Sequence, residues 1–251
     1  MTRRDDVNDL YKWPNKIEDV MTVLFWINII GSIVACIVKN DVIINILIVS
    51  QIIVSILYVV LSILDDNFFW YNAEQVRRQA AIENGFGIDI TEYKTEGYYN
   101  NTIPNNIEKF SVNAFESIMF SKTTAERMML KEGFRTLIAF ITFICACLVY
   151  KDYGVILIIF QTVFSAYFIE EFVRLCVYKS KLEKLYDSFY KQLITIGIKN
   201  EKQRSLLLAY AIEYEAIKAH YKIRLSEKEF WKHNEETSLK WEKISRELKI
   251  Y

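Results

Sequence analysis

Four long apolar stretches constrain what this chain can fold into. They are Met21–Val38, Val42–Leu64, Phe134–Tyr150 and Tyr153–Tyr178, and the first two carry no charged side chain. An α-helix rises about 1.5 Å per residue, so about 20 apolar residues cross a hydrocarbon core of about 30 Å. We therefore expect an all-α membrane protein with four transmembrane helices.

The short turns between these stretches predict how the helices pair. Lys39–Asp41 joins the first two stretches, and Lys151–Asp152 joins the last two. Turns this short make the joined helices antiparallel neighbours, so we expect two transmembrane hairpins. The chain then divides into an N-terminal segment with the first hairpin, a middle segment, the second hairpin and a tail, at residues 1–64, 65–133, 134–178 and 179–251.

The distribution of basic residues predicts the orientation. The N-terminal segment, the middle segment and the tail together contain 27 lysines and arginines, whereas the two turns contain two. Because cytoplasmic loops of membrane proteins carry the excess of basic residues, we expect both termini and the middle segment in the cytoplasm.

The middle segment and the tail show helical spacing of apolar residues. We expect helices from Phe68 to Glu83, over Ile107–Lys131, and through most of the tail, with a break at Gly197–Asn200. Ser226 and Glu229 form a capping-box pattern at the start of the last helix. With two prolines and seven glycines in the chain, these patterns predict a helical cytoplasmic layer.

Composition excludes several classes of function. The formal net charge is zero, which argues against binding a nucleic-acid polymer by bulk electrostatics. Only two histidines are present, and all four cysteines lie in or beside the apolar stretches, so no zinc site is expected. The chain lacks nucleophile-elbow, phosphate-loop and zinc-protease motifs, and we expect no enzyme activity, no metal and no cofactor.

Polar residues form a stripe along the second apolar stretch, at positions i, i+4, i+7 and i+11. On a helix these positions fall within about 60° of arc, and the fourth stretch repeats the i, i+4 step. One interpretation is that the stripe lines a water-filled pathway in an assembled pore. The other is that it forms hydrogen bonds between helices. The residues of the stripe are Gln51, Ser55, Tyr58 and Ser62, and those of the fourth stretch are Gln161 and Ser165.

The irregular part of the middle segment combines cations, aromatic rings and amides. Guanidinium groups bind phosphates, tyrosine rings stack on bases and amides read base edges, so the set suits a small nucleotide ligand. Alternatively, the arginines contact lipid phosphates and the tyrosines are core residues. A third location for a ligand site is the tail around Tyr214, His220 and Trp231. The candidate binding residues are Arg77, Arg78, Lys94, Tyr98, Tyr99, Asn100 and Asn101.

The layout resembles a known group of proteins. The resemblance rests on RRQAAIENGFG (Arg77–Gly87), YYNN (Tyr98–Asn101), NAFESIMFSK (Asn113–Lys122) and the tail segment Tyr214–Ile244, placed around two hairpins. Four-span membrane effectors of bacterial anti-phage systems look similar, and these are encoded beside nucleotide-second-messenger synthases, as in CBASS.

This resemblance implies a pore-forming effector of antiviral defence. Such a protein would be a homo-oligomer in the lipid bilayer of the bacterial inner membrane, activated by a cyclic oligonucleotide. The alternative is a membrane anchor or scaffold that recruits a soluble partner through the tail and forms no pore.

Overall fold

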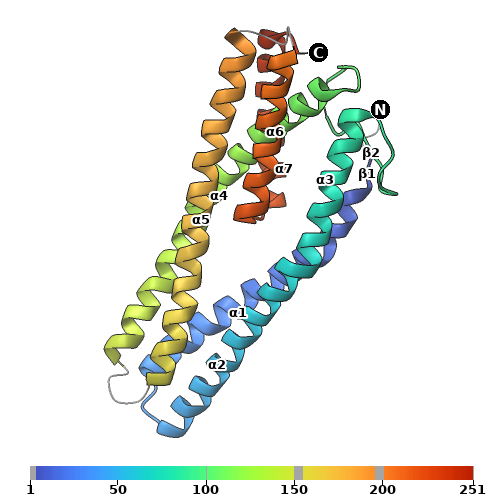
Figure 1. Cartoon of the computed structure of the whole chain (residues 1–251). Helices are drawn as coiled ribbons and strands as arrows, with labels where there is room; N and C mark the ends of the chain where they lie inside the picture. The colour runs from blue at the N-terminus through green and yellow to red at the C-terminus, as the bar shows by residue number, and fades with distance from the viewer. Residues whose placement is uncertain (1–3, 100, 150–154, 196–200, 251) are drawn as a thin grey trace. The chain divides into compact units, whose positions relative to one another are not determined.

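The computed structural model describes residues 4–99, 101–149, 155–195 and 201–250, with the backbone alone for 36, 146, 147, 149, 155–166 and 195. The described chain is helical apart from loops and one short strand pair (Figure 1). Its residues form two compact units. The polar unit comprises Met1–Asp9, Ala73–Leu130 and Arg174–Tyr251, and the apolar unit comprises Leu10–Asn72 and Lys131–Val173.

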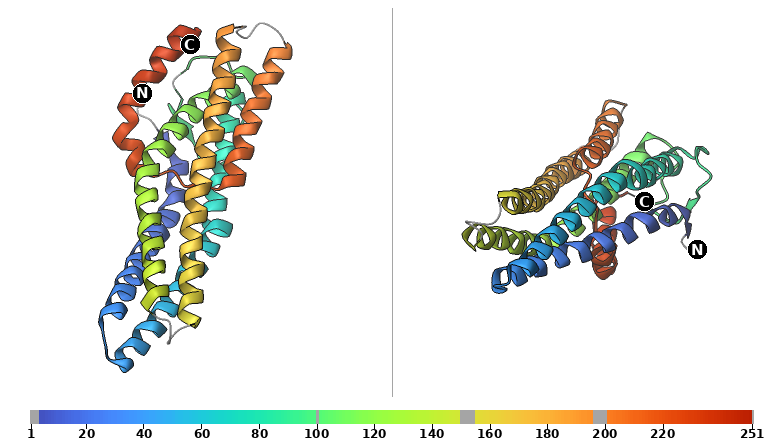
Figure 2. Two further views of the ribbon diagram at one scale, coloured as in Figure 1. Left: turned by 90° about the vertical axis from the view of Figure 1, so that its left-hand side faces the viewer. Right: turned by 90° about the horizontal axis from the view of Figure 1, so that it is seen from below.

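The apolar unit is built around a hairpin of two helices. The 3-10 helix η1 (Asp6–Tyr11) leads into α1 (Lys12–Ile37), and α2 (Asp41–Leu64) runs beside α1 (Figure 2). Asn40 caps α2, because its side-chain oxygen accepts hydrogen bonds from the amides of Val42 and Ile43 at 3.0 and 3.3 Å. A π-helical turn, η2 (Asp65–Phe69), follows α2 directly and continues into α3 (Trp70–Phe86).

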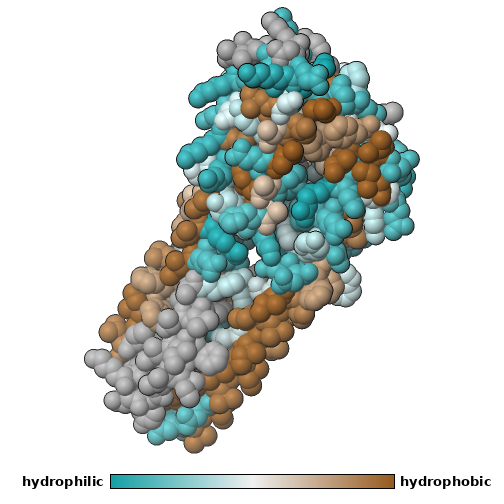
Figure 3. Space-filling model, in the orientation of Figure 1, coloured by the Kyte–Doolittle hydropathy of each residue, from teal (hydrophilic) through white to brown (hydrophobic). Residues whose placement is uncertain are grey.

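Helix α2 has its polar residues inside and its apolar residues outside. Its buried residues are the four members of the polar stripe, whereas isoleucines, valines and leucines such as Ile46, Val49 and Ile63 are exposed. A brown strip of apolar atoms follows the α1–α2 hairpin in Figure 3. A soluble helix shows the opposite pattern, with its apolar face toward the core.

Two stretches of the described chain are long and apolar enough to cross a membrane. They are Asp6–Ala35 and Asp41–Phe86, whose most apolar windows have mean hydropathies of 1.7 and 2.7. Only 28% and 22% of these windows are buried, so neither is the covered core helix of a soluble protein.

Two long helices belong to both units. Helix α4 (Ile107–Val149) lies in the polar unit up to Leu130 and in the apolar unit from Lys131 onward. Helix α5 (Val155–Thr195) lies in the apolar unit up to Val173 and then in the polar unit. The sequence predicted a helix over Ile107–Lys131 that leads into the third apolar stretch, and α4 continues without interruption from one to the other.

The polar unit is held together by an aromatic core. Phe115 of α4 lies 5.1 and 5.3 Å from the ring centres of Tyr186 and Phe189 of α5, and 5.5 Å from that of Trp241. Leu207 and other residues of α6 (Glu201–Tyr221) pack against the same core, and Trp241 lies on α7 (Glu227–Leu248).

The predicted start of the last helix is confirmed. Ser226 is the N-cap of α7, and its hydroxyl accepts a hydrogen bond from the amide of Glu229 at 3.3 Å. The amide of Ser226 itself donates to the sulfur of Met128 at 3.2 Å. This cap fixes where α7 begins.

A short strand pair joins the N-terminal segment to the loop between α3 and α4. Strand β1 (Arg4–Asp5) pairs antiparallel with β2 (Thr95–Glu96), with Arg4 opposite Glu96. The sequence predicted an all-α chain without this strand pair, because two residues are too few to show alternation.

Helices α3 and α4 approach each other closely at Gly85. A Cβ atom at this position would lie 2.6 Å from the Cβ of Phe110 and 2.9 Å from its Cα. Only glycine therefore allows the end of α3 to approach the start of α4 so closely.

Candidate ligand-binding site

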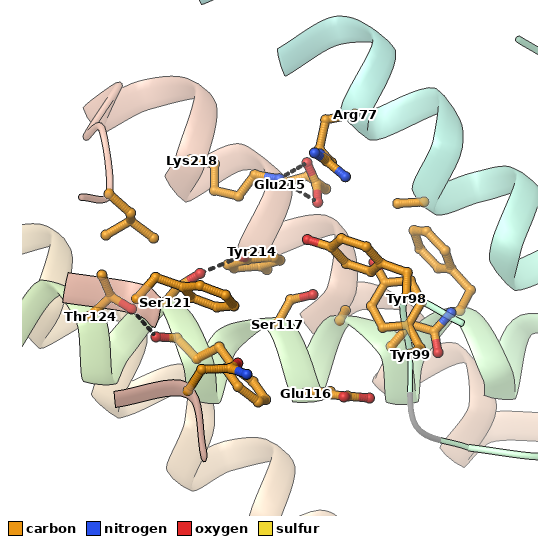
Figure 4. Close-up of a pocket in the computed structure, with 18 of the residues that line it drawn as sticks. Arg77, Tyr98, Tyr99, Glu116, Ser117, Ser121, Thr124, Tyr214, Glu215 and Lys218 are labelled. Carbon is orange, nitrogen blue, oxygen red and sulfur yellow. Dashed lines mark hydrogen bonds and ion pairs between the residues drawn. The ribbon is translucent and has the colours of Figure 1, made fainter. Parts of the chain in front are cut away.

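The polar unit contains a partly open cavity of about 340 Å³. Residues of α3, of the loop before α4, and of α4, α6 and α7 line it (Figure 4). Helix α4 forms one wall, because Asn113, Ser117, Ser121 and Thr124 recur at steps of three or four residues and share one helix face.

Three tyrosines give the cavity aromatic walls. The rings of Tyr98 and Tyr99 meet edge to face with their centres 4.9 Å apart. Burial raises the pKa of Tyr99 above its usual range, and a hydrogen bond with Ser117 offsets this only in part. Burial also raises the pKa of Tyr214 well above its usual range, and the Tyr214 hydroxyl lies 2.9 Å from that of Ser121. Tyr99 and Tyr214 are therefore neutral phenols at physiological pH.

Two cations line the cavity, and each is paired with a carboxylate. The Arg77 guanidinium donates to the carboxylate of Asp5 at 2.8 Å and lies over the Tyr98 ring at 5.1 Å. The Lys218 ammonium lies 3.1 Å from Glu215 and 3.8 Å from Glu74. Burial lowers the pKa of Lys218, but these two carboxylates outweigh burial and raise it overall, so Lys218 is charged.

The α4 wall also carries buried amide and carboxylate groups. Asn113 is 2% exposed, and its side-chain oxygen accepts a hydrogen bond from the amide of Asn101 at 2.8 Å. Among the described residues, the side-chain nitrogen of Asn113 has no hydrogen-bond partner. Glu116, which is 4% exposed, lines the cavity one helical turn before Phe120. A buried amide donor without a partner costs free energy, and a ligand acceptor in the cavity would satisfy it.

The cavity brings together part of the predicted binding set. Arg77, Tyr98 and Tyr99 line it, and Asn101 is hydrogen-bonded to the lining residue Asn113. Tyr214, which represented the alternative location in the tail, lines the same cavity. One residue of the tail location therefore lines the same cavity as Arg77, Tyr98 and Tyr99.

Other candidates lie elsewhere. Arg78 donates to the backbone oxygen of Glu74 in its own helix at 3.1 Å. Lys94 forms an ion pair with Asp89. Neither residue is part of the cavity lining, and the same holds for the exposed residues His220 and Trp231. Asn100 lies outside the described residues.

Sequence reasoning missed most of the α4 wall and the charged residues of α6. The polar residues of α4 recur at the same spacing that identified the stripe on α2, so that rule would have found them. Glu215 and Lys218 gave no such signal, because charges three residues apart on a helix are typical of a solvated surface pair.

In the apolar unit, the polar stripe faces other helices. The Asn28 amide of α1 donates to the Ser55 hydroxyl at 2.8 Å, and the Ser32 hydroxyl donates to the side-chain oxygen of Gln51 at 3.3 Å. Further along α2, the Ser62 hydroxyl lies 3.0 Å from that of Tyr167 on α5. These bonds are those expected of hydrogen bonding between helices.

Tyr58, Gln161 and Ser165 are the remaining members of the predicted pore lining. The ring of Tyr58, also in the stripe, meets that of Tyr167 at 5.5 Å. The side chains of Gln161 and Ser165 lie outside the described residues. The pore hypothesis is therefore argued from α2 alone.

No family model, curated protein or solved structure matches the chain.

Proposed function

We propose that this protein is a membrane effector whose cavity binds a nucleotide and whose apolar unit then breaches the bacterial inner membrane. The observation that carries the proposal is the course of α4. Residues of α4 between Phe110 and Thr124 line the cavity, and the same unbroken helix ends at Val149 in the apolar unit. A ligand that prefers one position of α4 would act on an element that both units share.

The cavity offers the groups that a nucleotide requires. Its volume of about 340 Å³ falls within the range of small-molecule sites. Tyr98 and Tyr99 supply rings on which a base can stack, Asn113 supplies an amide for a base edge, and Arg77 supplies a guanidinium for a phosphate. A cyclic oligonucleotide is the ligand that the resemblance to anti-phage effectors implies.

For the membrane part we propose four spans in two hairpins, with both termini in the cytoplasm. The excess of basic residues outside the two turns supports this orientation. The second hairpin would be formed by the end of α4 and the beginning of α5. Four helices enclose little space, so a pore requires several copies of the chain. The stripe of α2 would line that pore only after its hydrogen bonds to α1 are exchanged.

A membrane anchor without a pore is the second candidate. The bonded stripe favours it, because the polar residues of α2 already have partners within the subunit. Trp231 and Leu239 also favour it, because they are 53% and 61% exposed on α7 and could contact a soluble partner.

The proposal is tested by membrane depolarisation in cells that express the chain, followed with a potential-sensitive dye and a panel of cyclic oligonucleotides. Ala114→Trp fills the cavity from a side chain that is 8% exposed, whereas Leu130→Trp adds the same ring on α4 at a residue that is 87% exposed. We expect depolarisation with the wild type and Leu130→Trp, and none with Ala114→Trp.

Two results would count against the proposal. A folded Ala114→Trp variant that responds like the wild type would move the ligand site out of the cavity. Tight ligand binding without depolarisation in any variant would favour the anchor.

A further inference from the structure

One of the two cations that line the cavity is paired with a carboxylate from the N-terminal segment. Arg77 lines the cavity, and the Asp5 carboxylate lies 2.8 Å from its guanidinium nitrogen. The two side chains are only 16% and 14% exposed, so solvent screens this ion pair less than a surface pair. A ligand phosphate that approached Arg77 would meet the Asp5 carboxylate at the same fork.

Asp5 belongs to a short segment, Arg4–Asp6, that we name the N-terminal strap. The strap is attached to the loop before α4 by the β1–β2 pairing and by the amide of Asp6, which donates to the backbone oxygen of Lys94 at 3.0 Å. Arg4 pairs with Asp6 inside the strap, on its exposed side. Two side chains also attach the strap: Asp5, through its largely buried ion pair with Arg77, and Asp6, whose carboxylate accepts a hydrogen bond from the amide of Lys94 at 3.3 Å.

The loop that receives the strap is also a wall of the cavity. Gly97, Tyr98 and Tyr99 line the cavity directly after β2. Arg77 links the two features, because it contacts Asp5 of the strap and the ring of Tyr98. A substitution of Arg77 would therefore remove a contact of the strap and a contact of the aromatic wall.

We propose that the Asp5 carboxylate occupies the anion subsite of the cavity, and that an anionic group of the ligand displaces it from Arg77 and releases the strap. This inference rests on the proposed function of the cavity. Carboxylates and phosphates bind a guanidinium fork with the same geometry, and two anions at one fork repel each other. Strap docking and ligand binding therefore compete, and each weakens the other by the same factor.

The strap is connected to the apolar unit through the chain itself. The strap is followed along the chain by η1 and then by α1, the first helix of the apolar hairpin. The ligand would thus act on the first hairpin through the N-terminal segment and on the second hairpin through α4.

The test compares variants of the full-length chain in detergent by calorimetry, with inorganic pyrophosphate, cyclic di-AMP and cyclic di-GMP as probes. Asp5→Asn keeps the size of the side chain and removes its charge. Glu96→Gln is the matched control, because it removes one negative charge from the exposed side of the same strand pair. We expect Asp5→Asn to bind a probe about tenfold more tightly than the wild type, and Glu96→Gln to bind like the wild type. Arg77→Gln should abolish the gain in the Asp5→Asn background.

Hydrogen exchange supplies a second measurement. The amides of residues 4–6 and 94–96 should exchange faster in Asp5→Asn without any probe, and faster in the wild type once a probe is bound. Without a probe, these amides should exchange more slowly in Glu96→Gln than in Asp5→Asn.

The outcomes separate the two proposals. Equal affinity of Asp5→Asn and the wild type, with loss of binding in Arg77→Gln, would overturn the competition and leave the cavity as the ligand site. Unchanged protection of the strap in the ligand-bound wild type would overturn the release. Absence of binding by every variant would overturn the nucleotide function of the cavity, and the inference with it.

Discussion

The hydrogen bond between Asn28 and Ser55 allows the two interpretations of the polar stripe to be separated. It joins α1 to α2 inside the apolar unit, at 2.8 Å between the amide nitrogen and the hydroxyl oxygen. The perturbation is a double-mutant cycle with Asn28→Ala, Ser55→Ala and the double variant. If the stripe holds the hairpin together, the two side chains must be energetically coupled.

The structure gives the expected magnitude. Hydrogen bonds between helices in membranes contribute about 0.6 kcal/mol on average and up to about 1.7 kcal/mol. Asn28 and Ser55 are 1% and 6% exposed and their bond is short, so we expect a coupling free energy of about 1–1.7 kcal/mol. Asn28→Ala alone should cost more than this, because it also removes the contact with the backbone oxygen of Gln51 at 3.5 Å and leaves a small void.

The assay is reversible unfolding in mixed detergent micelles, followed by circular dichroism. Ser50→Ala is the control, because Ser50 is an exposed residue of α2 whose hydroxyl donates to Leu47 in the same helix. Its free energy of unfolding should change by less than about 0.5 kcal/mol.

A coupling free energy below about 0.3 kcal/mol, which is within the error of such cycles, would refute the reasoning. If the coupling were this weak and the variants also changed ion permeability, the stripe would line an ion pathway. A strong coupling with unchanged permeability would assign it to hairpin stability.

Two further predictions concern the polar unit. Phe115→Ala should lower the free energy of unfolding by about 3–5 kcal/mol, because the ring is fully buried against three aromatic neighbours. Thermal unfolding of Phe115→Ala and Phe115→Leu, measured together, would show whether the loss follows the volume removed. The pKa of Tyr214 is higher in the folded chain than in the unfolded chain, where a tyrosine titrates at about pH 10. The buried neutral phenol therefore contributes its full stabilisation below about pH 10. This stabilisation is lost as the pH rises through the pKa of the folded state, because the unfolded phenol loses its proton first. Tyrosinate absorbance against pH should therefore show one late-titrating group fewer in Tyr214→Phe.

The sequence predicted the features that depend on local patterns. The second apolar stretch began at Val42 and ended at Leu64, and α2 spans Asp41–Leu64. The polar stripe, found from helical spacing alone, is the buried set of that helix. Ser226 was expected to cap the last helix and does so. Periodicity and capping act within a few residues, so they can be read without the fold.

The cavity could be predicted only in part, because it depends on contacts between distant segments. Asp5 and Arg77 are 72 positions apart, and Ser121 and Tyr214 are 93 positions apart. Spacing along the chain shows which residues share a helix face, but not which faces meet.

The contact at Gly85 has a consequence for the size of ligand that the cavity accepts. Phe110, whose Cβ and Cα meet the backbone at Gly85, is also a lining residue of the cavity. Any larger residue at position 85 would push Phe110 and the start of α4 away from α3 and change the volume between them. Among diverged relatives, positions 85 and 110 should therefore covary in size, and a residue that touches no ligand would help to set which ligands fit.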